Sequence, residues 1–166
     1  MAELFKRSNC IEVGGGETPK HPEFLQCDIR DIPSVDYVCN AWDLPKYVEN
    51  NSIFYIYSRH FLEHLTFYDA RKTLEAWYSI LSTDGYCAII VPNISYHIDQ
   101  WKRGEEDLAI LGFWGKQRET DKGRIWDIHK SGYSISLLQT MASETGFASV
   151  EQVKDLPKNL HVRLYK

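Results

Sequence analysis

The chain has 166 residues, of which 43% are apolar, 13% aromatic and 25% charged, and its net charge is −4. This composition is typical of a globular protein that buries its own core, and it excludes an intrinsically disordered chain. The negative charge argues against general nucleic-acid binding, and no apolar run is long enough to predict a membrane-spanning helix. Residues 1–7 lack the apolar segment of a secretion signal, so we expect a cytoplasmic protein with one domain over residues 1–166.

Short apolar runs predict five strands in the first part of the chain. They are Cys10–Val13, Phe24–Cys27, Asp36–Cys39, Ile53–Tyr57 and Tyr86–Val91. The runs are nearly continuous rather than alternating, which is typical of strands buried on both faces of a parallel sheet. The interval between the first two strands is too short for a full helix, so we expect the first crossover helix to be shortened or absent.

Helical patterns and a final pair of strands complete the predicted elements. The spacing of Leu74, Trp77 and Leu81 predicts an amphipathic helix over 66–81, and a second helix fits 134–144. Residues 147–153 and 160–165 read as an antiparallel hairpin around a turn. Strands that alternate with helices predict an α/β fold with a mostly parallel sheet, closed by a C-terminal antiparallel hairpin.

The cysteines favour a reducing compartment. No C-x-x-C pair is present, and each cysteine lies in or beside a predicted strand, so we expect buried free thiols rather than a disulfide framework or a zinc site. The four positions are Cys10, Cys27, Cys39 and Cys87.

Polar residues at the ends of the first two strands are candidate ligand-binding residues, because ligands of parallel α/β sheets bind beyond the carboxyl ends of strands. Gly14, Gly15 and Gly16 either form a structural turn or let the backbone approach a ligand closely. They lack the G-x-G-x-x-G spacing and the helix that a pyrophosphate needs, which disfavours a dinucleotide oxidoreductase. Asp28 can accept both hydroxyls of an unphosphorylated ribose, or it is a solvated carboxylate or helix cap.

The segment 41–45 follows the third predicted strand. Asp43 can accept from an adenine amino group while Trp42 or Leu44 covers the ring, or the segment is an Asp-capped turn before Pro45.

The segment 58–65 follows the fourth predicted strand. His60, Glu63 and His64 match the H-x-x-E-H pattern of inverted zinc peptidases, which opens the alternative of a zinc hydrolase. The pattern follows a strand directly, and its first histidine falls in a strand-to-helix turn, so we expect no metal here.

Taken together, these segments resemble the class I S-adenosylmethionine-dependent methyltransferases, and most closely the small bacterial type. The resemblance covers about residues 9–93 well and continues more loosely through 134–166. It implies a Rossmann-like fold, S-adenosylmethionine as cofactor and transferase activity. The matching segments are E-V-G-G-G at 12–16, Q-C-D-I-R-D at 26–31, A-W-D-L-P at 41–45, N-S-I-F-Y-I-Y-S-R-H-F-L-E-H-L at 51–65, and L-S-T-D-G-Y-C-A-I-I-V-P-N at 81–93.

The resemblance also implies cofactor roles for individual residues. Those expected to hold the methionine end are Glu12, Gly14, Gly15 and Gly16. Those expected to hold the adenosine are Asp28 at the ribose, Ile29 packed on adenine, and Asp43 with Trp42 or Leu44 at the adenine edge. Those expected to form the floor beneath the sulfonium are Ser58, Arg59 and His60. The chain departs from the family pattern in its contiguous glycines, which leaves open a non-catalytic protein that binds the cofactor or a partner.

Residues 93–133 lie where such folds build a lid on the substrate side. Aromatic and cationic residues are interleaved there, which suits a small or medium acceptor that is anionic or glycan-like. We expect methylation at oxygen. The alternative is an amphipathic surface segment, since acidic residues largely balance the charge. The side chains concerned are Tyr96, Trp101, Phe113, Trp114, Lys116, Arg118, Lys122, Arg124, Trp126, His129 and Lys130. As general base we expect His129 first and His60 second, because histidine titrates near neutrality.

The N-terminal segment is too short to cap the substrate site. We therefore consider that a second copy supplies the missing wall, in a homo-oligomer.

Overall fold

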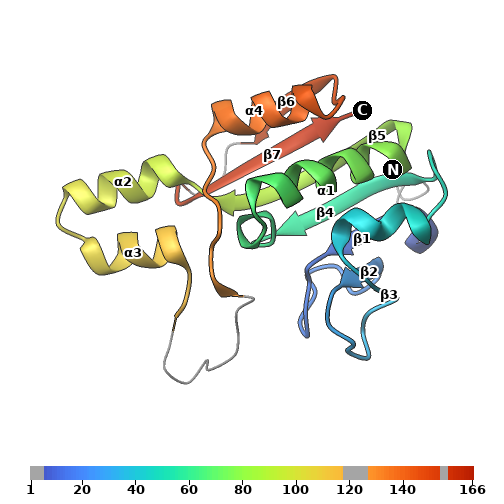
Figure 1. Ribbon diagram of the computed structural model, residues 1–166, viewed down its shortest axis with the longest axis horizontal. Coiled ribbons are helices and arrows are strands. Elements are labelled where there is room, and N and C mark those ends of the chain that lie inside the picture. The colour runs from blue at the N-terminus through green and yellow to red at the C-terminus, as the bar shows by residue number, and fades with distance from the viewer. Residues whose placement is uncertain (1–5, 118–126, 154–156) are drawn as a thin grey trace.

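A computed structural model of the protein describes residues 6–117, 127–153 and 157–166 (Figure 1). Its strands form one sheet in the order β3-β2-β1-β4-β5-β7-β6. The first five strands are parallel, and β7 is antiparallel to both β5 and β6. This confirms the predicted α/β, Rossmann-like, mostly parallel sheet with its C-terminal hairpin. The strands are β1 (Cys10–Val13), β2 (Leu25–Asp28), β3 (Tyr37–Val38), β4 (Ile53–Arg59), β5 (Leu81–Pro92), β6 (Ser149–Val153) and β7 (Asn159–Tyr165).

The helices connect these strands. The α-helices are α1 (Phe67–Ile80), α2 (Ile94–Lys102), α3 (Glu106–Trp114) and α4 (Ile135–Glu144), and the 3-10 helices are η1 (Arg7–Asn9), η2 (Ala41–Lys46) and η3 (Leu62–His64). None of the described helices has the length and apolar character needed to span a bilayer.

The register of the central strands brings the candidate residues to one edge of the sheet. Val13 pairs with Cys27 on one side and with Ser58 on the other. The residues that follow these three positions therefore leave the sheet next to one another, as expected for parallel strands.

Helix α1 forms where the periodicity predicts it. Thr66 caps it, since its hydroxyl accepts from the Asp69 amide at 3.1 Å. Leu74 and Trp77 lie fully buried in one core with residues of β4, β5, α4 and β7. Helices α1 and α4 therefore cover the same face of the sheet (Figure 1).

A separate aromatic cluster occupies the opposite face of the central strands. Its buried members, Tyr57, Ala88 and Ile90, all come from β4 and β5, and Tyr55 packs against them. The ring of Tyr55 lies 4.8 Å from that of Tyr86, measured between centroids. Tyrosine side chains thus cover this face of the sheet, as helices cover the other face.

The connection between β1 and β2 contains only turns and bends, which confirms that the first crossover helix is absent. The buried carboxylate of Glu12 holds this connection in place. Its two oxygens accept from the backbone amides of Lys20 at 2.9 Å and His21 at 2.6 Å. A charged acceptor inside the sheet thereby satisfies amides that a helix would otherwise pair.

Two helices that the sequence did not predict, α2 and α3, follow β5. They form an arm that extends from the sheet (Figure 1). Several of their apolar side chains are exposed, among them Leu108 at 55%, Leu111 at 48% and Trp114 at 59%. This arm makes up most of the described part of the expected lid, residues 93–133.

All four cysteines fall within the described residues, and all are free thiols, as expected. Cys27 and Cys39 lie side by side, with their sulfur atoms 3.8 Å apart.

Candidate cofactor site

A cavity of about 350 Å³ lies at the carboxyl edge of β1, β2 and β3. This volume falls in the range of small-molecule sites. It is lined by Val13, Gly14, Cys27, Asp28, Ile29, Arg30, Cys39, Asn40, Ala41, Trp42, His60, Phe61, His64, Leu65, Asp69, Asp127 and Lys130. Of the twelve residues predicted to bind the cofactor, the cavity brings together Gly14, Asp28, Ile29, Trp42 and His60.

Asp28 presents a buried carboxylate to this cavity, and Arg30 folds back onto it. The Arg30 guanidinium donates to both carboxylate oxygens at 3.0 Å, and the Arg30 amide donates to Oδ1 at 3.0 Å. The Gly16 amide adds a fourth hydrogen bond, to Oδ2, at 3.2 Å. A ribose that binds Asp28 must therefore share these oxygens with the guanidinium or displace it.

These hydrogen bonds keep Asp28 ionised. Burial alone would raise the pKa of the carboxyl group, but the hydrogen bonds from the Arg30 side chain and amide outweigh burial and lower that pKa. The residue therefore acts only as an acceptor near neutral pH, which suits the hydroxyls of a ribose.

Neighbouring side chains lie close to each glycine of the run 14–16. Gly14 has φ +75°, and a Cβ there would lie 2.5 Å from the Phe61 ring. Gly16 has φ +62°, and a Cβ there would lie 2.6 Å from the Arg30 guanidinium. Gly15 packs against Gln26, Pro19 and Glu12. Only Gly14 lines the cavity, so the other two glycines support the loop rather than the cavity wall.

The residues after β3 that were predicted to hold the adenine lie in different places. Of the two residues predicted as alternatives at the adenine edge, Trp42 lines the cavity, whereas Leu44 is fully buried in the core. The reason is that η2 turns Leu44 toward α1, which the sequence spacing alone did not show. Asp43 pairs with Lys46 at 2.7 Å and accepts from Asn40 at 3.1 Å, outside the cavity lining.

The three residues at the end of β4 that were predicted to form the floor beneath the sulfonium lie in different environments. Ser58 is buried, its hydroxyl has no hydrogen-bond partner among the described residues, and Arg59 is exposed. His60 lines the cavity with a left-handed φ of +50°, and its Nδ1 lies 3.0 Å from Glu63 Oε1. The carboxylate of Glu63 thus orients the imidazole. Glu12 lies behind the glycine loop and does not line the cavity.

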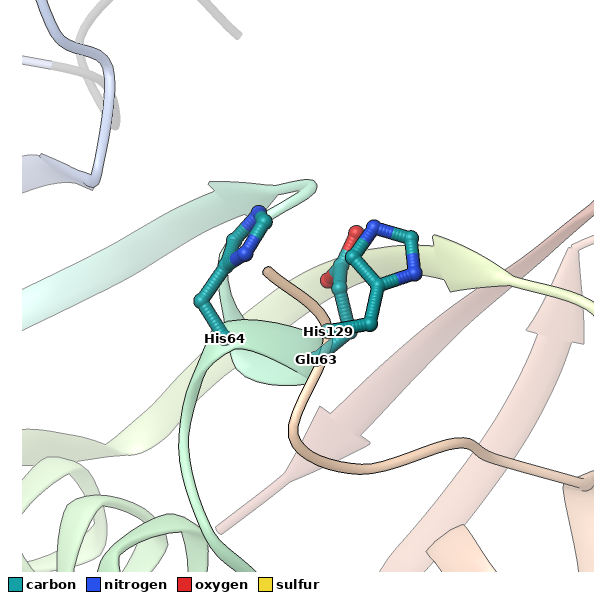
Figure 2. Close-up of side chains that lie close together, drawn as sticks. All are labelled: Glu63, His64 and His129. Atoms are coloured by element: carbon teal, nitrogen blue, oxygen red, sulfur yellow. The ribbon is translucent and has the colours of Figure 1, made fainter. Parts of the chain in front are cut away.

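The H-x-x-E-H pattern does not form the α-helix that inverted zinc peptidases use. His60 directly follows the strand, which ends at Arg59, and Glu63 and His64 lie in the three-residue helix η3. His129 reaches this place from the far end of the lid segment, with its ring 5.1 Å from that of His64 (Figure 2). Burial lowers the pKa of His129, so its imidazole is neutral at pH 7.

Sequence analysis did not single out Arg30 and Phe61, which line the cavity, whereas it placed the lining residue Lys130 on the substrate side. Arg30 stands two residues after the predicted ribose acceptor, so an i, i+2 Asp–Arg pair was a usable signal. Arg118, Lys122, Arg124 and Trp126 lie outside the described residues.

Comparison with solved structures shows that the chain has the class I S-adenosylmethionine-dependent methyltransferase fold. A SAM-dependent methyltransferase from Archaeoglobus fulgidus matches with a TM-score of 0.68 at 14% identity, over 99% of this chain and 89% of that chain. The 1,6-didemethyltoxoflavin-N1-methyltransferase of Burkholderia thailandensis, solved with 1,6-didemethyltoxoflavin and S-adenosylhomocysteine, matches with a TM-score of 0.63 at 12% identity, over 99% and 73%.

A third match extends the same fold to O-methyltransferases. An O-methyltransferase family protein from Burkholderia thailandensis gives a TM-score of 0.63 at 11% identity, over 98% of this chain and 52% of that chain. No protein-family profile and no curated protein matches the sequence. At these identities, the likeness is one of fold.

Proposed function

We propose that the protein binds S-adenosylmethionine in this cavity and transfers its methyl group to a hydroxyl of a small or medium acceptor, such as a sugar, nucleotide-sugar or natural-product-like molecule. The observation that carries the proposal is the ionised carboxylate of Asp28 at the end of β2, on a cavity that Gly14 and Trp42 also line. The structural neighbours named as SAM-dependent methyltransferases support it.

The lining residues fit this cofactor chemically. S-adenosylmethionine carries a free ribose and no phosphate, so it needs a carboxylate at the sugar rather than a helix N-terminus at a pyrophosphate. The cavity lining holds three carboxyl groups and two cationic side chains, and this excess of acidic groups favours a positively charged ligand. These residues are Asp28, Asp69, Asp127, Arg30 and Lys130. Trp42 supplies an aromatic surface for the adenine ring.

The cofactor supplies an activated methyl group when bound, and the protein's own residues align the acceptor and take its proton. Of the two histidines predicted as base, His60 lines the cavity and is oriented by Glu63. We therefore assign proton acceptance to the Nε2 atom of His60, since His129 does not line the cavity. The His60→Gln variant should lose more in turnover than in affinity for the cofactor.

Calorimetric titration with S-adenosylmethionine and S-adenosylhomocysteine tests the cofactor site. We expect binding to wild type and a loss of roughly 10-fold or more in Asp28→Ala, because a hydrogen bond to a charged acceptor is worth about 1.5–3 kcal/mol. Asp31→Ala is the matched control, since Asp31 is an exposed acid on the same loop. Absence of binding to either compound would refute the proposal, and binding without transfer to any hydroxylated acceptor would favour the non-catalytic alternative.

A further inference from the structure

Three potential metal-ligating side chains converge beside the cavity (Figure 2). Glu63, His64 and His129 each offer one ligand atom, and these atoms lie within 4.8 Å of one another. The cluster is held by backbone contacts between η3 and the end of the lid segment. The amides of Lys130 and Ser131 donate to the Glu63 carbonyl at 2.8 Å and 3.1 Å. The three side chains are thus fixed by the fold rather than gathered on a mobile surface.

Hydrogen bonds fix the tautomer of both histidines. His64 Nδ1 lies 3.2 Å from the Ile128 carbonyl oxygen, and His129 Nδ1 lies 3.1 Å from the Gly112 carbonyl oxygen. A carbonyl oxygen only accepts, so each Nδ1 carries the proton and donates it. With Nδ1 as the donor, Nε2 is the nitrogen of each ring that can bind a metal, which is the arrangement of metal-binding histidines.

Glu63 supplies the third ligand and an independent sign that a cation is needed. Its side chain is only 1% exposed, and His60 engages Oε1. The other oxygen, Oε2, is buried and has no hydrogen-bond partner among the described residues. An unpartnered carboxylate oxygen is costly to bury, and a cation between it and the two imidazoles would remove that cost.

We propose that Glu63, His64 and His129 bind one divalent transition-metal ion, of which zinc is the best fit. Two imidazoles and one carboxylate are donors that suit zinc and related ions, whereas magnesium and calcium prefer oxygen ligands alone. Three protein ligands leave a coordination position open for another molecule. His64 lines the cavity, so that position is within reach of a molecule bound there.

The role of the ion rests on the proposed methyl transfer. An acceptor hydroxyl at the open position would be more acidic, because a bound cation favours the deprotonated form. As the oxygen forms its bond to the methyl carbon, the sulfur–carbon bond breaks with its electron pair going to sulfur, and the hydroxyl proton passes to His60.

Metal titration of the stripped, tag-free protein tests the site without any adenosyl compound. We expect wild type to bind one zinc ion per chain by calorimetry, and the Glu63→Gln, His64→Gln and His129→Gln variants to bind about 10-fold or more weakly. His161→Gln is the control, since His161 lies on β7, outside the cluster. Cobalt substitution should give ligand-field absorption without thiolate charge transfer, which excludes the cysteines as ligands.

The outcomes separate the two proposals. No stoichiometric binding, equal affinity in wild type and in all folded variants, or a thiolate band with cobalt would each overturn the metal site. Circular dichroism establishes which of the three ligand variants fold. One folded variant is enough to compare its zinc affinity with that of wild type. Zinc binding together with failure to bind S-adenosylmethionine would refute the proposed function while leaving the metal site in place.

Discussion

At the end of β2, Asp28 and Arg30 form an ion pair inside the space that a ribose would enter. The guanidinium occupies both carboxylate oxygens that the proposed cofactor needs, and it adds a positive charge next to a positively charged ligand. Arg30 is therefore a competitor for the site, and cofactor binding requires it to move or to share Asp28.

Replacing Arg30 should tighten binding. We expect Arg30→Ala to raise the affinity for S-adenosylmethionine by about 3- to 10-fold, since displacement of a charge-assisted hydrogen bond no longer opposes binding. Calorimetric dissociation constants measure the effect. Arg7→Ala serves as control, because Arg7 pairs with Asp36 away from the cavity. Weaker binding in Arg30→Ala would mean that the guanidinium contacts the ligand instead.

Residue by residue, the sequence was enough to place side chains at the cavity where local position decides the outcome. Asp28 and Gly14 follow directly from their places at strand ends. Leu44 could not be separated from Trp42, because both are apolar and only the path of η2 decides which one faces the cavity. The meeting of His129 with Glu63 was hidden, because the two are far apart in the chain and are joined only by backbone contacts of the folded lid segment.

Among the elements, the central strands divide their two faces between different kinds of packing. Helices cover one face with aliphatic side chains and Trp77, whereas tyrosines of β4, β5 and β7 cover the other. Burial raises the pKa of Tyr55, and the neighbouring Tyr86 and Tyr57 raise it further. Burial likewise raises the pKa of Tyr86.

This tyrosine face should make the fold sensitive to alkali. Because the pKa of Tyr55 is higher in the folded than in the unfolded chain, its contribution to stability is complete below about pH 10 and is lost as pH rises above that value. We expect the free energy of unfolding in Tyr55→Phe to fall less steeply above pH 10, by up to about 1.4 kcal/mol per pH unit.

Urea unfolding at a series of alkaline pH values measures these slopes. Tyr68→Phe is the control, since Tyr68 is 71% exposed on α1. An identical slope in wild type and Tyr55→Phe would show that Tyr55 does not hold its proton more tightly in the folded state.

The predicted elements were most accurate where burial imposes a pattern. Strand β1 and helix α4 match their predicted ranges to within one residue, and Ser134 caps α4. Helix α3 was missed because it is not apolar along one stripe, so its period gave no helical signal, whereas α2 has an apolar stripe that the prediction overlooked. Strand β5 begins at Leu81, earlier than predicted, because α1 passes into it without a loop.

On the scale of the whole molecule, the arm of α2 and α3 exposes several large apolar side chains among the described residues. The exposed side chains are Ile98, Trp101, Leu108, Ile110, Leu111 and Trp114. Exposed apolar side chains mark an interaction site where they form a contiguous patch. We propose that a second copy of this chain packs on these side chains.

Self-association should depend on this surface. We expect the wild-type chain to sediment as an oligomer, and Leu108→Lys combined with Leu111→Lys to shift it toward the monomer, because charge on an apolar interface resists burial. Tyr68→Lys provides an exposed substitution outside the arm. A wild-type chain that sediments as a monomer at every concentration would exclude an interface between copies here.

The short edge strand β3 has a consequence for how tightly a ligand can bind. Its two residues pair only with β2, and the connections on both sides of β2 contain no helix. Such an edge opens locally at a lower free energy than the rest of the sheet, so its amide protons exchange with solvent first. A nucleoside bound between Asp28 and Trp42 would contact the residues around β3 only while β3 is paired with β2. Ligand affinity and the protection of β3 amides against exchange are therefore linked. Each tenfold increase in the ratio of ligand concentration to dissociation constant raises the free energy of opening this edge by about 1.4 kcal/mol.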